Sequence, residues 1–322
     1  MELNKIYQGH CLEVLKTLPS KTINTVVTSP PYWGLRDYGV EGQIGLENSV
    51  EEYVSALVDV FREIKRILKD DGTVWVNLGD AYAGSGKGAW AEKDKQKHVY
   101  VPDTKSHLTN INNVPTGLKP KDLIGLPWRV AFALQADGWY LRQDIIWDKP
   151  NCMPESVKDR PTRCHEYVFL LAKNKDYYYD YKSILEPIAI STSNDKRTLE
   201  SRFTNKRPER NFPGQSSKGG GMLEPLEIGK RNKRSVWSVT TKPFKEAHFA
   251  TFPEDLIEPC ILAGCPLNGV VMDPFFGSGT TGLVALKHGR NFIGIELNKE
   301  YIKIAEKRLS KVQLELIHEL GC

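Results

Sequence analysis

The chain has 322 residues, of which 40% are hydrophobic and 26% charged, and its formal net charge is +4. This composition suits one α/β core with an additional lobe, and it excludes a fibrous or disordered chain. No apolar run reaches the roughly 18 residues that a membrane span requires. The N-terminal residues also lack the apolar region of a signal peptide, so a cytoplasmic protein is expected.

The positive charge is concentrated in one segment. Residues 191–235 contain eleven Lys/Arg and five Asp/Glu, a net charge of +6, which leaves −2 for the rest of the chain. Core-type apolar patterns stop after residue 190 and resume only at residue 236. A local basic patch on an otherwise near-neutral protein is typical of binding to a phosphate backbone. This segment is therefore the candidate for a separate nucleic-acid-reading lobe.

The cysteines show no metal-binding pattern. Two of them, Cys260 and Cys265, lie five positions apart, but no second pair completes a tetrahedral site. No metal is expected, and reduced, mostly structural thiols are the expected state of the six cysteines: Cys11, Cys152, Cys164, Cys260, Cys265 and Cys322.

Hydrophobic periodicity predicts alternating strands and helices. Before residue 84 these are strands over residues 4–7, 25–28 and 73–78, with helices over residues 9–18 and 49–71. The second helix opens with a capping box, Ser49 and Glu52. The β-α-β order favours a parallel sheet. After residue 121 the pattern predicts helices over residues 126–137, 253–264, 280–289 and 299–316, and strands over residues 140–147, 167–172, 270–273 and 291–296.

Residues 84–121 are rich in glycine and lysine and show no periodicity. We expect a long mobile loop there. Loops of this length in compact domains are more often functional than idle, although a disordered insertion is the alternative.

A glycine-rich turn follows the apolar run that ends in Asp273. Gly277 and Gly279 allow backbone N–H groups to approach a ligand, and the helix starting near Thr280 presents its positive dipole end there. Roughly twenty residues later a strand ends in Glu296, from which a carboxylate can accept hydrogen bonds from ribose hydroxyls. The pattern predicts a nucleoside cofactor. A nicotinamide site or an ordinary turn remains an alternative for the loop by itself.

A second motif, Ser29, Pro30, Pro31 and Tyr32, follows the strand over residues 25–28. The two prolines fix the backbone, so the serine hydroxyl and the Pro30 carbonyl point in set directions. This tetrapeptide resembles the catalytic motif of DNA methyltransferases that modify an exocyclic amine. Asp-Pro-Phe-Phe-Gly-Ser-Gly-Thr at residues 273–280 resembles their S-adenosylmethionine loop. The order of the motifs is similar to that of the permuted beta group of these enzymes.

The resemblance implies an α/β, Rossmann-like S-adenosylmethionine-dependent methyltransferase sheet with circularly permuted motif order and an inserted DNA-recognition segment. Residues 1–190 are expected to form the catalytic part, residues 191–235 the target-recognition segment and residues 236–322 the cofactor-binding part. Serine at the first catalytic position is most typical of cytosine N4 enzymes, whereas adenine N6 enzymes more often carry aspartate or asparagine.

The resemblance also implies roles for individual residues. Ser29 and Pro30 are expected to accept the hydrogens of the amine, and Tyr32 to stack on a flipped-out base. The family's acidic residue near the N-terminus is replaced by His10, so the Cys11 backbone is expected to serve instead. His165 and Glu166 are interpreted as structural. The cofactor-binding residues are expected to be Asp273, Phe275, Gly277, Gly279, Thr280, Glu296, Cys11, Phe249 and Thr251.

The leading hypothesis is therefore a bacterial or phage DNA methyltransferase that acts on cytosine N4 in duplex DNA. The alternatives are adenine N6 methylation by the same architecture and a DNA-binding homologue without activity. A cytosine C5 mechanism fits poorly, because Pro259-Cys260 lies inside a predicted helix. The enzyme is expected to protect DNA against a cognate restriction endonuclease or to be solitary. The sequence leaves open whether the protein forms a homodimer, and no membrane partner is expected.

Overall fold

The computed structural model is described for residues 1–34, 39–84, 115, 117–187, 230–242 and 252–319. Its contacts divide the chain into two compact units, Met1–Asp180 with Ser235–Cys322, and Tyr181–Arg234. The expected mobile loop at 84–121 and the expected recognition segment at 191–235 lie largely outside the described residues.

The larger unit is built on one twisted sheet. Among the described residues eight strands form it, in the order β1-β10-β9-β2-β3-β5-β4-β8. Neighbours pair in parallel except at β5, which is antiparallel to both β3 and β4. The strands are β1 (Lys5–Gln8), β2 (Ile23–Thr28), β3 (Leu68–Leu78), β4 (Tyr140–Asp148), β5 (His165–Ala172), β8 (Val236–Ser238), β9 (Val270–Asp273) and β10 (Asn291–Glu296).

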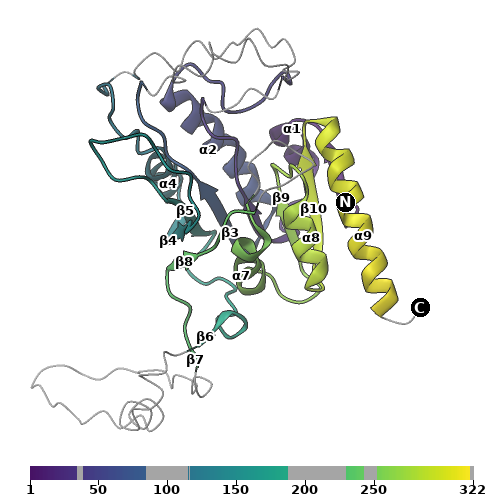
Figure 1. Cartoon of the computed structure of the whole chain (residues 1–322). Coiled ribbons are helices and arrows are strands. Elements are labelled where there is room, and N and C mark those ends of the chain that lie inside the picture. Colours follow the sequence, from purple (N-terminus) through teal and green to yellow (C-terminus); the bar gives the residue numbers. More distant parts are fainter. Residues whose placement is uncertain (35–38, 85–114, 116, 188–229, 243–251, 320–322) are drawn as a thin grey trace, which may run out of the picture. The chain divides into compact units, whose positions relative to one another are not determined.

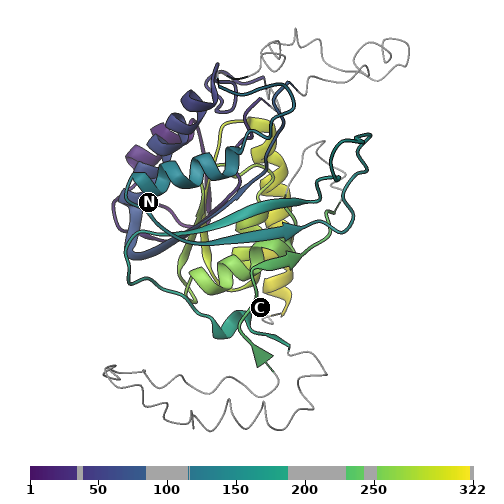
Figure 2. The same cartoon turned by 90° about the vertical axis from the view of Figure 1, so that its left-hand side faces the viewer.

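Helices cover both faces of this sheet (Figures 1 and 2). One face carries α1 (Cys11–Thr17), α2 (Val50–Ile67) and α4 (Leu126–Ala136), and the other carries α7 (Glu254–Gly264), α8 (Thr280–Lys287) and α9 (Lys299–Glu319). Tyr53 and Phe61 of α2 are fully buried against the first face. On the second face Gly264 packs so closely on Trp75 that an added Cβ would lie 2.7 Å from the indole nitrogen. Both hydrophobic interfaces stabilise the sheet that carries the site.

Helix α2 begins at a side-chain cap and ends where the chain enters the sheet. The Ser49 hydroxyl accepts a hydrogen bond from the Glu52 N–H at 3.1 Å, as the capping box predicts, but the Glu52 carboxylate accepts from the Asn48 N–H instead of the Ser49 N–H. The helix ends at Ile67, four residues earlier than predicted. Leu68 already belongs to β3, where it is fully buried and paired with Ile23.

The two predicted motifs meet in the middle of the sheet. From β9 the chain crosses through α8 to β10 on one side, whereas from β2 it crosses through α2 to β3 on the other side. β9 and β2 are direct neighbours. This reversal is a topological switch point, and ligands of open α/β sheets bind beyond the carboxyl ends of the strands at such points. The glycine-rich loop follows β9 there, and the tetrapeptide follows β2.

The smaller unit contains the 3₁₀ helix η3 (Lys182–Ile184) and the antiparallel strands β6 (Glu186–Pro187) and β7 (Lys230–Arg231). The Glu186 carboxylate accepts hydrogen bonds from the Nε atoms of Arg231 at 2.8 Å and Arg234 at 2.7 Å. These contacts hold β6 beside β7 and the residues that follow it.

The expectation of reduced thiols is wrong for Cys152 and Cys164, which form a disulfide with their Cα atoms 5.3 Å apart. Both lie in the connection between the antiparallel strands β4 and β5, whose pairing of Asp148 with His165 brings the two cysteines together. Sequence spacing alone gave no sign of this pairing. The described thiols of Cys11, Cys260 and Cys265 are free and buried.

No helix within the described ranges is long and apolar enough to cross a membrane.

Candidate active site

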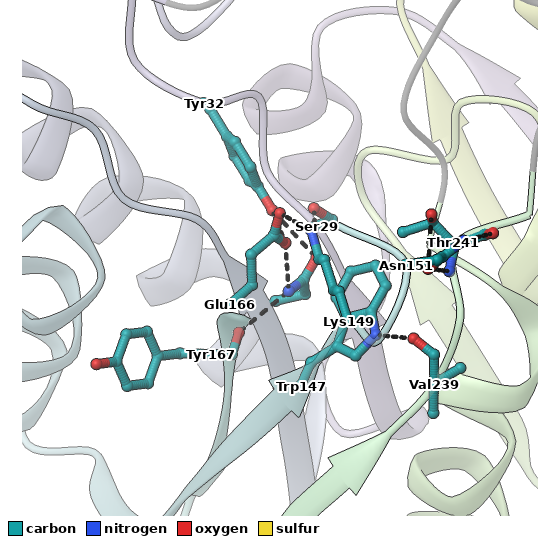
Figure 3. A network of polar contacts seen from close by, with 10 residues as sticks. Ser29, Tyr32, Trp147, Lys149, Asn151, Glu166, Tyr167, Val239 and Thr241 are labelled. Atoms are coloured by element: carbon teal, nitrogen blue, oxygen red, sulfur yellow. Dashed lines mark hydrogen bonds and ion pairs between the residues drawn. The ribbon is translucent and has the colours of Figure 1, made fainter. Parts of the chain in front are cut away.

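The tetrapeptide lies at the carboxyl end of β2, beside the end of β3 (Figure 3). The Ser29 hydroxyl donates a hydrogen bond to Oδ1 of Asn77, a residue of β3, at 3.3 Å. The Pro31 carbonyl accepts a hydrogen bond from the buried Tyr53 hydroxyl of α2 at 2.8 Å, which anchors the proline turn to the core. Among the described residues none donates a hydrogen bond to the Pro30 carbonyl, so this oxygen is available to a ligand.

Tyr32 is held by its hydroxyl and by a close backbone. The hydroxyl lies 2.7 Å from Oε2 of Glu166 and 3.2 Å from Oδ1 of Asn77. Burial, and then the negative charge of Glu166, raise the pKa of Tyr32 well above its ordinary value, so the phenol stays protonated. The ring packs on Gly79, where an added Cβ would lie 2.7 Å from the ring. The ring therefore has a fixed orientation beside Ser29.

Glu166 connects this motif to the neighbouring antiparallel strands. Its Oε2 accepts from the Asn77 side-chain amide at 3.1 Å, and its Oε1 pairs with the Lys149 ammonium. The Lys149 ammonium also lies 4.1 Å from the centre of the Trp147 ring. The Trp147 indole in turn donates to the Val239 carbonyl at 2.8 Å. Sequence reasoning gave Glu166 a structural role and assigned none to Asn77 or Lys149.

Asp273, at the end of β9, joins the two motifs directly. Its Oδ1 accepts from the Thr28 hydroxyl at 2.6 Å and from the Phe275 N–H at 3.0 Å, while Oδ2 accepts from the Thr281 hydroxyl at 2.7 Å. Thr28 immediately precedes Ser29, so the carboxylate fixes the glycine-rich loop against the strand that leads into the tetrapeptide. Burial raises the pKa of Asp273 to about 6, although these three donors oppose the shift.

The glycine-rich loop lies next to the end of β10. Gly277 has a positive φ of 52°, and its N–H donates to Oε2 of Glu296 at 2.7 Å. Oε1 of Glu296 accepts from the Asn298 N–H at 2.8 Å, and burial raises the pKa of this carboxyl group above its ordinary value. Phe275 is half-buried. The Glu296 carboxylate is thus positioned at the loop, where the sequence predicted a ribose contact.

Phe276 packs between the glycine-rich loop and β10. Phe276 is 3% exposed and stacks on Phe292 with ring centres 5.4 Å apart. It presses against Gly294 of β10 so closely that an added Cβ would lie 2.4 Å from its ring. Of the two consecutive phenylalanines, Phe275 is therefore the one that remains accessible.

The helix α8 begins at this loop. Gly279 is its N-cap, with a positive φ of 81°, and Thr280 is buried at the first helical position. Nη1 of Arg308, from α9, donates to the Ser278 carbonyl at 2.7 Å, to the Ser278 hydroxyl at 2.9 Å and to the Thr280 hydroxyl at 3.1 Å. Arg308 thus fixes the loop from outside. Nothing in the sequence pattern of the last helix singled it out.

Cys11 lies at the first position of α1, beyond the end of β1. The Gly9 N–H donates to the Glu296 carbonyl at 3.0 Å, which brings the start of α1 to the end of β10. The Cys11 side chain is 6% exposed, and burial raises the pKa of its thiol to about 12. The contact predicted for the Cys11 backbone stays a prediction. Phe249 and Thr251 lie outside the described residues.

The structure thus gathers those predicted residues that it describes at the carboxyl ends of four neighbouring strands, β1, β10, β9 and β2, and it adds Asn77 from β3. Asn77 was missed although a signal existed. It is a polar residue, 4% exposed, near the end of a strand that was predicted to lie in the same parallel sheet as the strand of the tetrapeptide. A polar group buried in that position requires partners and often belongs to a site.

The sheet with its antiparallel strand β5, and the loop at the switch point, define a Rossmann-like methyltransferase fold. The cytosine-N4-specific PvuII DNA methyltransferase matches with a TM-score of 0.60 at 20% identity, over 97% of this chain and 91% of that chain. A DNA modification methylase from Thermus thermophilus, TTHA0409, solved in complex with S-adenosyl-L-methionine, matches with a TM-score of 0.56 at 21% identity, over 95% of each chain.

Comparison of the sequences identifies the family, whereas the structural matches show the fold. The family model N6_N4_Mtase, described as DNA methylase, matches residues 23–307. The chain is 49% identical to type II methyltransferase M.Cfr9I of Citrobacter freundii, over 96% of this chain and 89% of the relative. It is 48% identical to type II methyltransferase M.SmaI of Serratia marcescens, over 95% and 90%. The chain belongs to this DNA methylase family, the N6/N4 amino methyltransferases.

Proposed function

We propose that this DNA methylase transfers a methyl group from S-adenosylmethionine to the exocyclic N4 amine of cytosine in duplex DNA. The observation that carries the proposal is the position of Ser29. Its hydroxyl lies at the end of β2, next to the strand β9 that leads into the cofactor loop. Serine at the first position of the tetrapeptide favours cytosine N4 over adenine N6.

The residues present suit S-adenosylmethionine, which supplies an electrophilic methyl group when bound. Glu296 offers a carboxylate to ribose hydroxyls, and Gly277 has no side chain to block the approach of the ligand to the loop. The half-buried Phe275 provides an apolar wall. Gly279 and Thr280 place a helix N-terminus beside the loop, and the backbone at Cys11 lies near the end of β10. Phe249 and Thr251 remain predicted contacts.

Asp273 has a different place in this proposal. Its carboxylate already accepts three hydrogen bonds from protein donors. We therefore assign it the task of holding the loop against β2, and its predicted contact with the cofactor becomes secondary.

The chemistry requires a better nucleophile than the cytosine amine, whose lone pair is delocalised into the ring. The Ser29 hydroxyl oxygen and the Pro30 carbonyl oxygen accept the two amine hydrogens, which turns the lone pair out of conjugation and stabilises the positive charge that develops during transfer. Tyr32 stacks on the base, which must leave the duplex to reach this position, and Pro31 fixes the turn. No covalent intermediate with the protein is needed.

The cysteines support an amine target. Methylation at cytosine C5 requires an activated thiolate. Cys260 is 1% exposed inside α7, and burial raises the pKa of Cys265 to about 12. None of the described free thiols is exposed.

A role in restriction–modification is proposed from the relatives, which are named type II methyltransferases. On this proposal residues 191–235 contact the DNA, with their net charge of +6 directed to phosphates. A cognate endonuclease and a homodimer remain open parts of the proposal.

The test is to incubate the protein with duplex DNA and methyl-labelled S-adenosylmethionine, digest the DNA to nucleosides and identify the product by mass spectrometry. N4-methylcytosine is the expected product. N6-methyladenine keeps the fold and the cofactor but contradicts the inference from serine. Cofactor binding without label in the DNA favours a binding-only homologue.

A further inference from the structure

We propose that Glu166 is a positioning residue that sets the direction of the hydrogen bonds at Ser29. The inference rests on the proposed function only in requiring an exocyclic amine as the methyl acceptor. The serine can assist that amine only if its oxygen accepts a hydrogen bond from it. Its own proton must therefore point elsewhere, and the network behind the serine decides where (Figure 3).

Two acceptors fix the orientation of the Asn77 side-chain amide. Its Nδ2 lies 3.1 Å from Oε2 of Glu166 and 3.1 Å from the Tyr167 carbonyl oxygen. A carboxylate and a carbonyl can only accept hydrogen bonds, so the NH₂ side of the amide must face them. Oδ1 of Asn77 therefore faces the opposite way, toward Ser29 and Tyr32.

Both hydroxyl protons then point into this network. The Tyr32 hydroxyl is 2.7 Å from Oε2 of Glu166 but 3.2 Å from Oδ1 of Asn77, and a hydrogen bond to a carboxylate is the stronger one. Tyr32 thus donates to Glu166. The Ser29 hydroxyl donates to Oδ1 of Asn77, and its oxygen lone pairs are left for the amine.

Lys149 fixes the orientation of the Glu166 carboxylate. Its ammonium pairs with Oε1 of Glu166, which leaves Oε2 to Tyr32 and Asn77. Both partners are largely shielded, with 18% of the lysine side chain and 16% of the glutamate side chain exposed. A glutamine at position 166 would keep its oxygen toward Lys149 and turn its NH₂ group to the Tyr32 hydroxyl. The Tyr32 proton would then go to Oδ1 of Asn77 and displace the Ser29 proton toward the amine.

The experiment compares Glu166→Gln with Glu166→Asp in the full chain. Glutamine keeps the size but adds a donor, whereas aspartate is shorter but still only accepts. We expect kcat to fall about 10- to 100-fold in the glutamine variant and less in the aspartate variant, with KM for DNA and Kd for S-adenosylmethionine changed by no more than about twofold. A space-filling role predicts the reverse order, because glutamine is the better match in shape.

The control is Glu63→Gln, which removes a partly shielded ion pair with Arg66 on α2, far along the chain from the site. Its kcat is expected to stay within about twofold of the parent. A glutamine variant at position 166 that equals or exceeds the aspartate variant overturns the proposal, as does parental kcat in the glutamine variant. The methylated base is identified in the same reactions, so an adenine product contradicts the proposed function while the order of the two variants still decides the role of Glu166.

Discussion

Ser29 is the residue on which the proposed chemistry depends. Ser29→Ala removes the oxygen that accepts from the amine but leaves the Pro30 carbonyl and the cofactor loop in place. We expect kcat to fall about 100- to 1,000-fold, the loss typical of one preorganised polar group at a reacting centre. Calorimetric affinity for S-adenosylmethionine is expected to remain unchanged. Ser310→Ala, on the exposed side of α9, is the control, and a kcat within about tenfold of the parent in Ser29→Ala contradicts the assignment.

Because of Asp273, the free energy of unfolding is expected to depend on pH. Its pKa in the folded protein is about 6, whereas an aspartate in an unfolded chain titrates near ~3.9. At a pH between these two pKa values, the Asp273 carboxyl group is ionised in the unfolded chain but still protonated in the folded protein. The contribution of Asp273 to the free energy of unfolding is therefore complete below pH ~4 and lost as the pH rises through about 6, a change of about 3 kcal/mol.

Urea unfolding midpoints of the parent and of Asp273→Asn, measured from pH 4 to 7, test this term. The asparagine cannot ionise, so the parent is expected to lose stability relative to the variant as the pH rises across that range. Parallel curves for the two proteins would show that Asp273 has an ordinary pKa in the folded state.

Some residues of the site could be predicted from the sequence, and others could not. Ser29 and Asp273 stand in motifs that predict a site without any structure. Glu166 and Lys149 belong to strand β5 and to the residues just after β4, which are far from the tetrapeptide in the chain, and only the order of the sheet brings their side chains to this site. Their part in the network depends on side-chain direction, which hydrophobic periodicity does not specify.

At the scale of elements, α9 has a function that its amphipathic pattern does not show. Arg308 uses one nitrogen to bind the Ser278 carbonyl and the hydroxyls of Ser278 and Thr280. Arg308→Gln is expected to weaken S-adenosylmethionine binding about tenfold or more, because the carbonyl loses a charged donor and the loop loses its outer support. Isothermal titration calorimetry measures this effect.

The matched control on the same helix is Lys303→Ala, whose ammonium pairs with Glu300 at an exposed position. It is expected to bind the cofactor like the parent, since exposed pairs contribute little. Equal affinities in the Arg308 and Lys303 variants would mean that the loop holds its shape without α9.

Elements with strong periodicity were predicted well, and their ends less so. The stripe of apolar residues in α2 and the β-branched run of β2 fixed the type of each element, because burial of one face or of a whole strand leaves a clear pattern. The end of α2 was placed too late. Leu68 fits the helical stripe as well as the strand, and its pairing with Ile23 across the sheet decided the outcome.

At the scale of the whole molecule, charge is distributed to suit a polyanion. Residues 191–235 carry the net charge of +6, and the proposal directs it to DNA. Replacing Lys206, Arg207 and Arg210 by glutamine is expected to reduce DNA affinity at low salt by about tenfold or more. The slope of log K against log salt concentration should become shallower by about 0.9 for each phosphate that the variant no longer neutralises. Fluorescence anisotropy across a salt series measures both quantities.

Cofactor affinity serves as the internal control for that variant, and it is expected to stay unchanged. An unchanged salt slope would place the phosphate contacts elsewhere on the protein. The sequence could locate this segment by charge and by the absence of core patterns. It could not give its structure, because basic, glycine- and serine-containing stretches carry little information about packing.

The proposed function requires that the exocyclic amine of cytosine meets the cofactor between the ends of β2 and β9. A crystal structure of the protein with its duplex DNA substrate and a non-reactive analogue of S-adenosylmethionine tests this most directly. We expect a flipped cytosine on Tyr32, with N4 within about 3.2 Å of both the Ser29 hydroxyl and the Pro30 carbonyl. A target base bound away from Ser29, or an adenine in its place, would contradict it.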